Sequence, residues 1–263
     1  MLARMELNGA PATLDQIKAL ALTNYGHFTS MLVEDNRVRG LSLHLERLVR
    51  DCWHLFNVEL DTDRVREFVR KALAGAEQPV TARVTIYDPT LEMGAIGSAA
   101  EPHVLVTTRS ASTAQPAPWR VQAVSYRRED PAIKHVGLFG AMKHRRAAQR
   151  DGFDDVLFLN ADGTISEIAT SNIGFIRGDQ VVWPRSEWLA GVTMGLLRQG
   201  LDEAVTEEAV TLSDLPAFDA AFATNAATGV RSIVAVDGTE WSADHPKLDE
   251  LRELYAEIPG EEI

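Results

Sequence analysis

Apolar positions in the first 110 residues follow helical spacing in two stretches and strand-like runs elsewhere. Apolar residues recur at intervals of three and four over residues 41–56 and again over 65–73, which predicts two amphipathic helices. Asp61 precedes the second stretch and suits the N-cap of that helix. Short apolar runs predict strands at 28–33, 80–87 and 104–107. This order of elements predicts a small unit of mixed α/β structure.

The pattern beyond residue 119 also mixes strands and helices, without strict strand–helix–strand alternation. Strands are predicted at 120–126, 156–159, 165, 173–176, 180–183, 220–224 and 232–236. Helices are predicted at 139–151, 191–197 and 247–254. The stretch SASTAQPAP, residues 110–118, has neither charge nor periodicity. We therefore predict a mixed α/β (α+β) chain with two domains, residues 1–110 and 119–263, joined by a linker at 111–118.

Charge and cysteine content disfavour several classes of function. The chain has 38 acidic and 26 basic residues and a formal charge of −12, so a general nucleic-acid or anionic-membrane binder is disfavoured. The single cysteine, Cys52, excludes an intramolecular disulfide, a CxxC pair and a cysteine-based zinc site. No apolar run approaches the ~18 residues of a membrane helix, and the N-terminus lacks a signal-peptide core. We expect a cytoplasmic protein without nucleic-acid or membrane partners.

Several common catalytic motifs are missing from the sequence. It contains no GxSxG elbow, no GxGxxG or P-loop phosphate cradle, and no HExxH pair. His135 and His144 lie nine residues apart across a predicted helix start, which is poor geometry for a shared metal. We therefore expect no metal site.

Lysine is scarce, so any chemistry that needs an amine has only five candidates. Lys134 lies in IKHVG just before a predicted helix, and Glu167 ends a short strand after an Asp-Gly turn. Gly191-Val192-Thr193 opens another helix. Each feature alone has an ordinary structural explanation. Together they supply an amine, a carboxylate and a helix N-terminus, which suit the aldehyde, pyridine nitrogen and phosphate of pyridoxal 5′-phosphate (PLP).

Six segments of the chain resemble the class IV aminotransferases, the fold-type-IV family of PLP enzymes. That family includes branched-chain aminotransferases, D-amino-acid transaminases and 4-amino-4-deoxychorismate lyases. The resemblance covers residues 26–238 and implies a small N-terminal α/β domain and a larger C-terminal PLP-binding domain with a barrel-like mixed sheet. The segments are HFTSMLV (27–33), HLERL (44–48), IKHVG (133–137), the span 147–175, LAGVT (189–193) and FATNAATGVRSIVAVDG (222–238).

The resemblance implies roles for residues on the cofactor side. Lys134 would form the Schiff base and carry the proton between Cα and C4′, while its only nearby rival, Lys143, lies within a predicted helix. Glu167 would pair with the pyridine nitrogen. Arg47 would hold the phosphate, the alternative being a surface arginine of a helix. Leu189 would pack on the ring, and the phosphate would meet Val192, Thr193, Ala226 and Ala227.

On the substrate side the resemblance implies Phe28, Ser30, Arg83 and Thr228. Arg83 matches a position near the substrate carboxylate in branched-chain enzymes, although a partly exposed strand arginine explains it equally well. The chain departs from the common family pattern at Gly137, Met194, Ala226 and Ala227. These departures weaken any subfamily assignment more than the cofactor assignment.

Three functions stay open at this point. The first is a PLP-dependent aminotransferase that moves an amino group between an amino acid or amine and a 2-oxo acid. The second is the lyase reaction that releases pyruvate from aminodeoxychorismate, since His27 to Ser30 resembles the lyase strand. The third is a non-catalytic scaffold that binds PLP. The resemblance also implies a homodimer.

Overall fold

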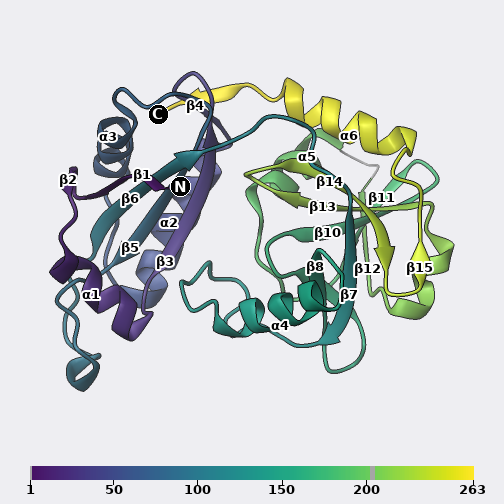
Figure 1. Ribbon diagram of the computed structural model, residues 1–263, viewed down its shortest axis with the longest axis horizontal. Helices are drawn as coiled ribbons and strands as arrows, with labels where there is room; N and C mark the ends of the chain where they lie inside the picture. Colours follow the sequence, from purple (N-terminus) through teal and green to yellow (C-terminus); the bar gives the residue numbers. More distant parts are fainter. Residues whose placement is uncertain (1, 202–204) are drawn as a thin grey trace. The chain divides into compact units, whose positions relative to one another are not determined.

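The computed structural model describes residues 2–201 and 205–263 and groups them into two compact units (Figure 1). The first unit contains residues 1–113, 133–137 and 259–263, and the second contains residues 114–132 and 138–258. The sequence pattern placed the boundary at residues 111–118. In the structure, residues 133–137 and 259–263 join the first unit because they form backbone hydrogen bonds with its strands.

The first unit is built on a five-stranded antiparallel sheet in the order β2-β1-β6-β5-β3. A separate pair of strands, β4 and β16, joins the C-terminus to the rest of the unit. Its strands are β1 (Leu2–Leu7), β2 (Ala10–Pro11), β3 (His27–Val33), β4 (Arg37–Arg39), β5 (Val80–Tyr87), β6 (His103–Ser110) and β16 (Gly260–Glu262). Its helices are α1 (Leu14–Thr23), α2 (Leu41–Phe56), α3 (Thr62–Leu73) and the 3₁₀ turn η1 (Met93–Ala95).

Side chains of the first unit's sheet alternate between two apolar clusters, because neighbouring residues of a strand point to opposite faces. Val84 and Ile86 pack with α2 and α3 in the larger cluster. Tyr87 and Leu105 pack with residues of α1 in a smaller one. The predicted α2 has the observed bounds, and Asp61 caps α3 by accepting hydrogen bonds from Asp63 N and Arg64 N. α2 therefore lies on one face of the sheet with its polar residues at defined positions.

The second unit is built on a curled nine-stranded mixed sheet in the order β12-β11-β10-β13-β14-β7-β8-β9, with β15 paired to β14. Ile165 N donates a hydrogen bond to Val210 O, which links the start of β9 to the residues after β12 and brings the sheet's ends together. The strands are β7 (Trp119–Ser125), β8 (Asp155–Leu159), β9 (Ile165–Ile168), β10 (Asn172–Arg177), β11 (Gln180–Pro184), β12 (Val205–Glu208), β13 (Ala220–Asn225), β14 (Gly229–Val236) and β15 (Thr239–Glu240). The helices are α4 (Phe139–Arg150), α5 (Val192–Leu201), α6 (Pro246–Glu257) and the 3₁₀ helix η3 (Leu212–Ala217).

The curled sheet also has two apolar faces. Ile173 and Phe175 of β10 point into one cluster, whereas Ile176 packs with α5 and α6 in another. A third cluster holds α4 against β8. The barrel-like mixed sheet predicted from the family resemblance is therefore confirmed. No helix in the described part of the chain is long and apolar enough to cross a membrane.

His27 at the start of β3 makes folding sensitive to acid. Its side chain is fully buried and its ring nitrogens have no hydrogen-bond partner among the described residues. Burial lowers the pKa of His27 from 6.5 to about 4. The folded chain thus keeps the ring neutral between those values, whereas the unfolded chain protonates it, so stability falls as pH decreases through this window.

We predict that the free energy of unfolding falls by about 3 kcal/mol between pH 6.5 and 4 on account of His27. His27→Phe should flatten this dependence, because the apolar ring has no proton to bind. Urea unfolding at a series of pH values measures it, with exposed His54→Gln as the control. An unchanged slope in His27→Phe would contradict the prediction.

Candidate active site

Lys134 lies in a segment that extends the first unit's sheet at the edge of β3. Phe28 N donates to Lys134 O at 2.8 Å, and Val136 N donates to Gly26 O at 2.9 Å. The backbone N–H of Lys134 donates to Asp51 Oδ2 on α2 at 3.1 Å. Both backbone polar groups of Lys134 are thereby held, one by the sheet and one by the helix beneath it.

Asp51 is a residue that the sequence reasoning missed. Its side chain is 1% exposed, and Oδ1 accepts hydrogen bonds from Arg50 Nε and Nη2 at 3.0 and 2.7 Å. The arginine compensates the buried carboxylate, while Oδ2 holds Lys134. In the sequence, Asp51 could have been identified by its position one helical turn after Arg47, on the buried face of α2.

Arg47 is buried in α2, with 6% of its surface exposed, so it is not a surface arginine of the helix. Burial lowers the pKa of Arg47 to about 10, and Asp51 partly opposes that shift. The guanidinium is still charged at neutral pH. A buried cation of this kind is stabilised by an anion, and a guanidinium matches phosphate oxygens well.

Phe28, which we expect on the substrate side, lies close to the side chains of Arg83 and Lys134. The Arg83 guanidinium carbon lies 3.6 Å from the ring centroid, and Lys134 Nζ lies 4.9 Å from it. Ser30 follows Phe28 on the same face of β3 and pairs with Arg83 in the sheet register. Burial, with Arg109 as a second cause, lowers the pKa of Arg83. The surroundings of Phe28 are therefore cationic.

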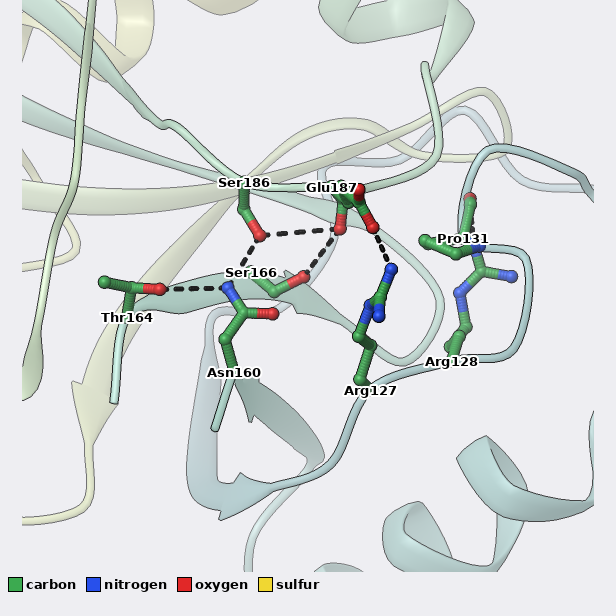
Figure 2. A network of polar contacts seen from close by, with 8 residues as sticks. All are labelled: Arg127, Arg128, Pro131, Asn160, Thr164, Ser166, Ser186 and Glu187. Atoms are coloured by element: carbon green, nitrogen blue, oxygen red, sulfur yellow. Dashed lines mark hydrogen bonds and ion pairs between the residues drawn. The ribbon is translucent and has the colours of Figure 1, made fainter. Parts of the chain in front are cut away.

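In the second unit, Glu167 of β9 is a buried carboxylate, 5% exposed, with two donors. Oε1 accepts from Arg128 Nε at 2.7 Å, and Oε2 accepts from Leu189 N at 3.3 Å. The Arg128 side chain is 9% exposed and also donates to the carbonyl of Pro131 (Figure 2). Sequence reasoning did not single out Arg128, because nothing local distinguishes it from the exposed Arg127.

The start of α5 has the features of an anion site. Asn172 Nδ2 donates to Leu189 O at 2.8 Å. A Cβ on Gly191 would lie 2.1 Å from Asn172 Oδ1, so a larger residue there would have to displace the Asn172 amide. Thr193 is 1% exposed, and its buried Oγ1 has no hydrogen-bond partner in the described part of the chain. The helix begins at Val192, and the N–H groups and positive dipole end of a helix N-terminus favour phosphate.

A polar network fixes the segment that precedes α5 (Figure 2). Asn160 Nδ2 donates to Ser186 Oγ at 2.8 Å, and Ser166 Oγ donates to Glu187 O at 3.2 Å. Arg127 forms an ion pair with the Glu187 side chain. These bonds hold residues 186–187 against the β8–β9 hairpin, which sets the position of Leu189 beside Glu167.

The turn between β13 and β14 holds the remaining residues expected at the site. Asn225 Oδ1 accepts hydrogen bonds from Ala227 N, Thr228 N and Thr228 Oγ1 at 3.0, 3.0 and 3.1 Å. These donors therefore serve the turn in this structure. A contact of Ala226, Ala227 or Thr228 with phosphate or substrate stays a prediction.

Each unit, taken by itself, holds part of the chemistry that PLP requires. The first supplies the Lys134 amine and the buried Arg47 cation, and the second supplies the Glu167 carboxylate and the α5 N-terminus. The buried Thr193 hydroxyl, which has no hydrogen-bond partner among the described residues, and the buried Arg47 guanidinium are donors that suit a phosphate. The residues fit the cofactor.

Residues 26–236 match the family described as Amino-transferase class IV. The chain belongs to that family, and it is a PLP-dependent aminotransferase. It is 25% identical to a probable branched-chain-amino-acid aminotransferase of Rickettsia bellii, over 96% of this chain and 94% of the relative. The family predicted from the sequence is confirmed.

Two solved structures share the fold closely. A putative 4-amino-4-deoxychorismate lyase of Legionella pneumophila superposes with a TM-score of 0.84 and 22% identity, over 95% of this chain and 96% of that one. The branched-chain aminotransferase of Thermoproteus uzoniensis has a TM-score of 0.84 and 19% identity, over 97% and 94%. One fold thus carries two reactions, and the site must distinguish them.

We predict that Arg128→Met destabilises the chain by about 3–5 kcal/mol, because it leaves the buried Glu167 carboxylate without its cation. Arg127→Met is the matched control, since its pair with Glu187 is exposed and should contribute about 1 kcal/mol or less. Denaturant unfolding of both variants measures the difference. Equal losses in the two variants would contradict the prediction.

Proposed function

We propose that this aminotransferase acts on an amino donor with a carboxylate, using Lys134 as the catalytic amine and Arg83 as the carboxylate anchor. The observation that carries the proposal is the group around Phe28, where Lys134 Nζ and the Arg83 guanidinium lie 4.9 and 3.6 Å from one ring. An arginine suits a carboxylate through paired hydrogen bonds. The Rickettsia relative, named for branched-chain amino acids, supports a donor of that class.

Each cofactor-side residue has a role in this proposal. PLP, when bound, withdraws electrons from the donor's Cα and so makes the Cα proton removable. Lys134 Nζ, in its uncharged form, takes that proton and returns it at C4′. The Glu167 carboxylate, held by Arg128 and Leu189 N, accepts a hydrogen bond from the pyridine N–H.

The proposed phosphate site uses donors from α2 and from the start of α5. Arg47 supplies a buried cation, and Val192 and Thr193 supply backbone N–H groups and the Thr193 hydroxyl at the start of α5. Leu189, whose backbone N–H donates to Glu167, would pack against the cofactor ring. A firmly held phosphate keeps the reacting atoms beside Lys134 through successive half-reactions.

The lyase reaction is a second candidate because of Ser30. Its hydroxyl lies on the same face of β3 as Phe28 and opposite Arg83 on β5, so it could pass a proton near the substrate. Release of pyruvate from aminodeoxychorismate without an oxo-acid acceptor would favour the lyase. Conversion of bound cofactor to pyridoxamine phosphate by an amino acid would favour transamination.

A homodimer and a cytoplasmic location complete the proposal. Both come from the family resemblance and composition, and the family assignment supports the first. Light scattering of the purified chain measures the oligomeric state, and a mass near 28.9 kDa would contradict the dimer.

We predict that Lys134→Ala abolishes turnover and the visible absorbance of the chain loaded with PLP, because no other amine takes its place. Lys143→Ala is the matched control and should keep both, since Lys143 lies on α4. Single-turnover spectra with L- and D-amino acids make the measurement. A wild-type chain that binds PLP and reacts with no amino compound would instead support the non-catalytic scaffold.

We predict that Arg83→Met raises the KM for amino acids by about ten- to a hundredfold, the value of a hydrogen bond to a charged group. An amine substrate without a carboxylate should keep its kcat/KM, because it never uses the arginine. Steady-state rates with both substrates measure this selectivity. An equal loss for both would assign Arg83 a structural role.

A further inference from the structure

A buried chain of hydrogen bonds leads away from Arg47 to two residues without an assigned role. Arg47 Nη2 donates to Thr29 Oγ1 at 2.7 Å. Thr29 Oγ1 lies 2.6 Å from His44 Nδ1. Thr29 and His44 are 0% and 1% exposed, so these contacts are shielded from water. They join β3, which carries Thr29, to α2, which carries the other two residues.

The chemistry of arginine fixes the direction of the first of these two hydrogen bonds. A guanidinium has donors and no acceptor, so Thr29 Oγ1 accepts from Arg47. The hydroxyl proton of Thr29 remains available to His44 Nδ1, which accepts it in the tautomer that carries the ring proton on Nε2. Burial, with the charges of Arg47 and Lys134, lowers the pKa of His44 well below 6.5, in agreement with a neutral ring.

The His44 ring has one hydrogen-bond partner in the described part of the chain. Nε2 is buried and makes no hydrogen bond there, so the contact with Thr29 is the only polar contact that the ring makes. An apolar side chain at this buried position would avoid an unsatisfied Nε2. The histidine is therefore best explained by what its Nδ1 does for Thr29.

We propose that Thr29 and His44 are positioning residues that orient the Arg47 guanidinium toward the cofactor's phosphate. His44 fixes the rotation of the Thr29 hydroxyl, so that an oxygen lone pair faces Arg47 Nη2. Thr29 accepts from one of the five N–H donors of the guanidinium and thereby holds its Nη2 end in place. This inference rests on the proposed role of Arg47 as a phosphate ligand.

Binding of PLP and of pyridoxal, which lacks the phosphate, tests the proposal. Thr29→Val keeps the shape of the side chain but removes the hydroxyl, and should weaken PLP binding by about tenfold or more. Pyridoxal binding should change little. His44→Leu should act in the same direction, because it removes the acceptor for the Thr29 proton. Absorbance titration of the apoenzyme gives the dissociation constants.

Two matched variants separate positioning from packing. Thr29→Ser retains the hydroxyl and should restore PLP affinity to within about threefold of wild type. Thr108→Val changes a buried threonine of β6 whose Oγ1 has no hydrogen-bond partner among the described residues, so it should leave both affinities unchanged. The ³¹P resonance of bound PLP should shift in Thr29→Val but not in Thr108→Val.

Arg47→Met distinguishes failure of this inference from failure of the proposed site. If Arg47→Met weakens PLP but Thr29→Val does not, Thr29 has no positioning role and the inference is wrong. If Arg47→Met leaves the ratio of PLP to pyridoxal affinity unchanged, Arg47 does not hold the phosphate, and both proposals fail. Equal weakening of PLP and pyridoxal in Thr29→Val also overturns the inference, since it reports general packing.

Discussion

The pairing of residues 133–137 with β3 is the constraint on which the chemistry of the first unit depends. Hydrogen bonds from Phe28 N to Lys134 O and from Val136 N to Gly26 O fix the register of this short segment. A slip of one residue would turn Lys134 to the opposite face of the sheet. Asp51 opposes such a slip, because it accepts the Lys134 N–H from α2. Helix α2 therefore carries both Asp51, which holds the backbone of Lys134, and Arg47, one turn earlier.

This arrangement gathers cations in a chain that is acidic as a whole. Arg47 is buried and Arg83 is partly buried, and burial lowers the pKa of each. The formal charge of −12 therefore does not describe the surroundings of Lys134. Removing a cation from water costs free energy, and an anion bound beside it offsets part of that cost. Binding of a phosphate or carboxylate to the folded chain alone therefore adds stability, which couples cofactor binding to folding.

Periodicity predicted the long elements, and it failed where pairing partners lie far apart in sequence. The bounds of α2 and the Asp61 cap follow from local pattern, since apolar spacing and capping chemistry are local. β1, α1, β4 and β16 were not predicted, because short strands and an exposed helix leave little pattern. The pairing of Lys134 with β3 has no local signal. The ion pair of Glu167 with Arg128 likewise required three-dimensional structure, since the neighbouring Arg127 is chemically identical.

The departures from the family pattern explain why the orientation of Arg47 matters in this chain. Ala226 and Ala227 bring no hydroxyl groups, and Asn225 already accepts the hydrogen bonds of Ala227 N and Thr228. In the proposed site the phosphate then depends mainly on Arg47 and the α5 N-terminus. With fewer donors, the geometry of each one determines a larger share of the affinity. Because the phosphate has few donors, Thr29 and His44 contribute to affinity by orienting Arg47. A phosphate site with more hydroxyl groups would depend less on the orientation of one arginine.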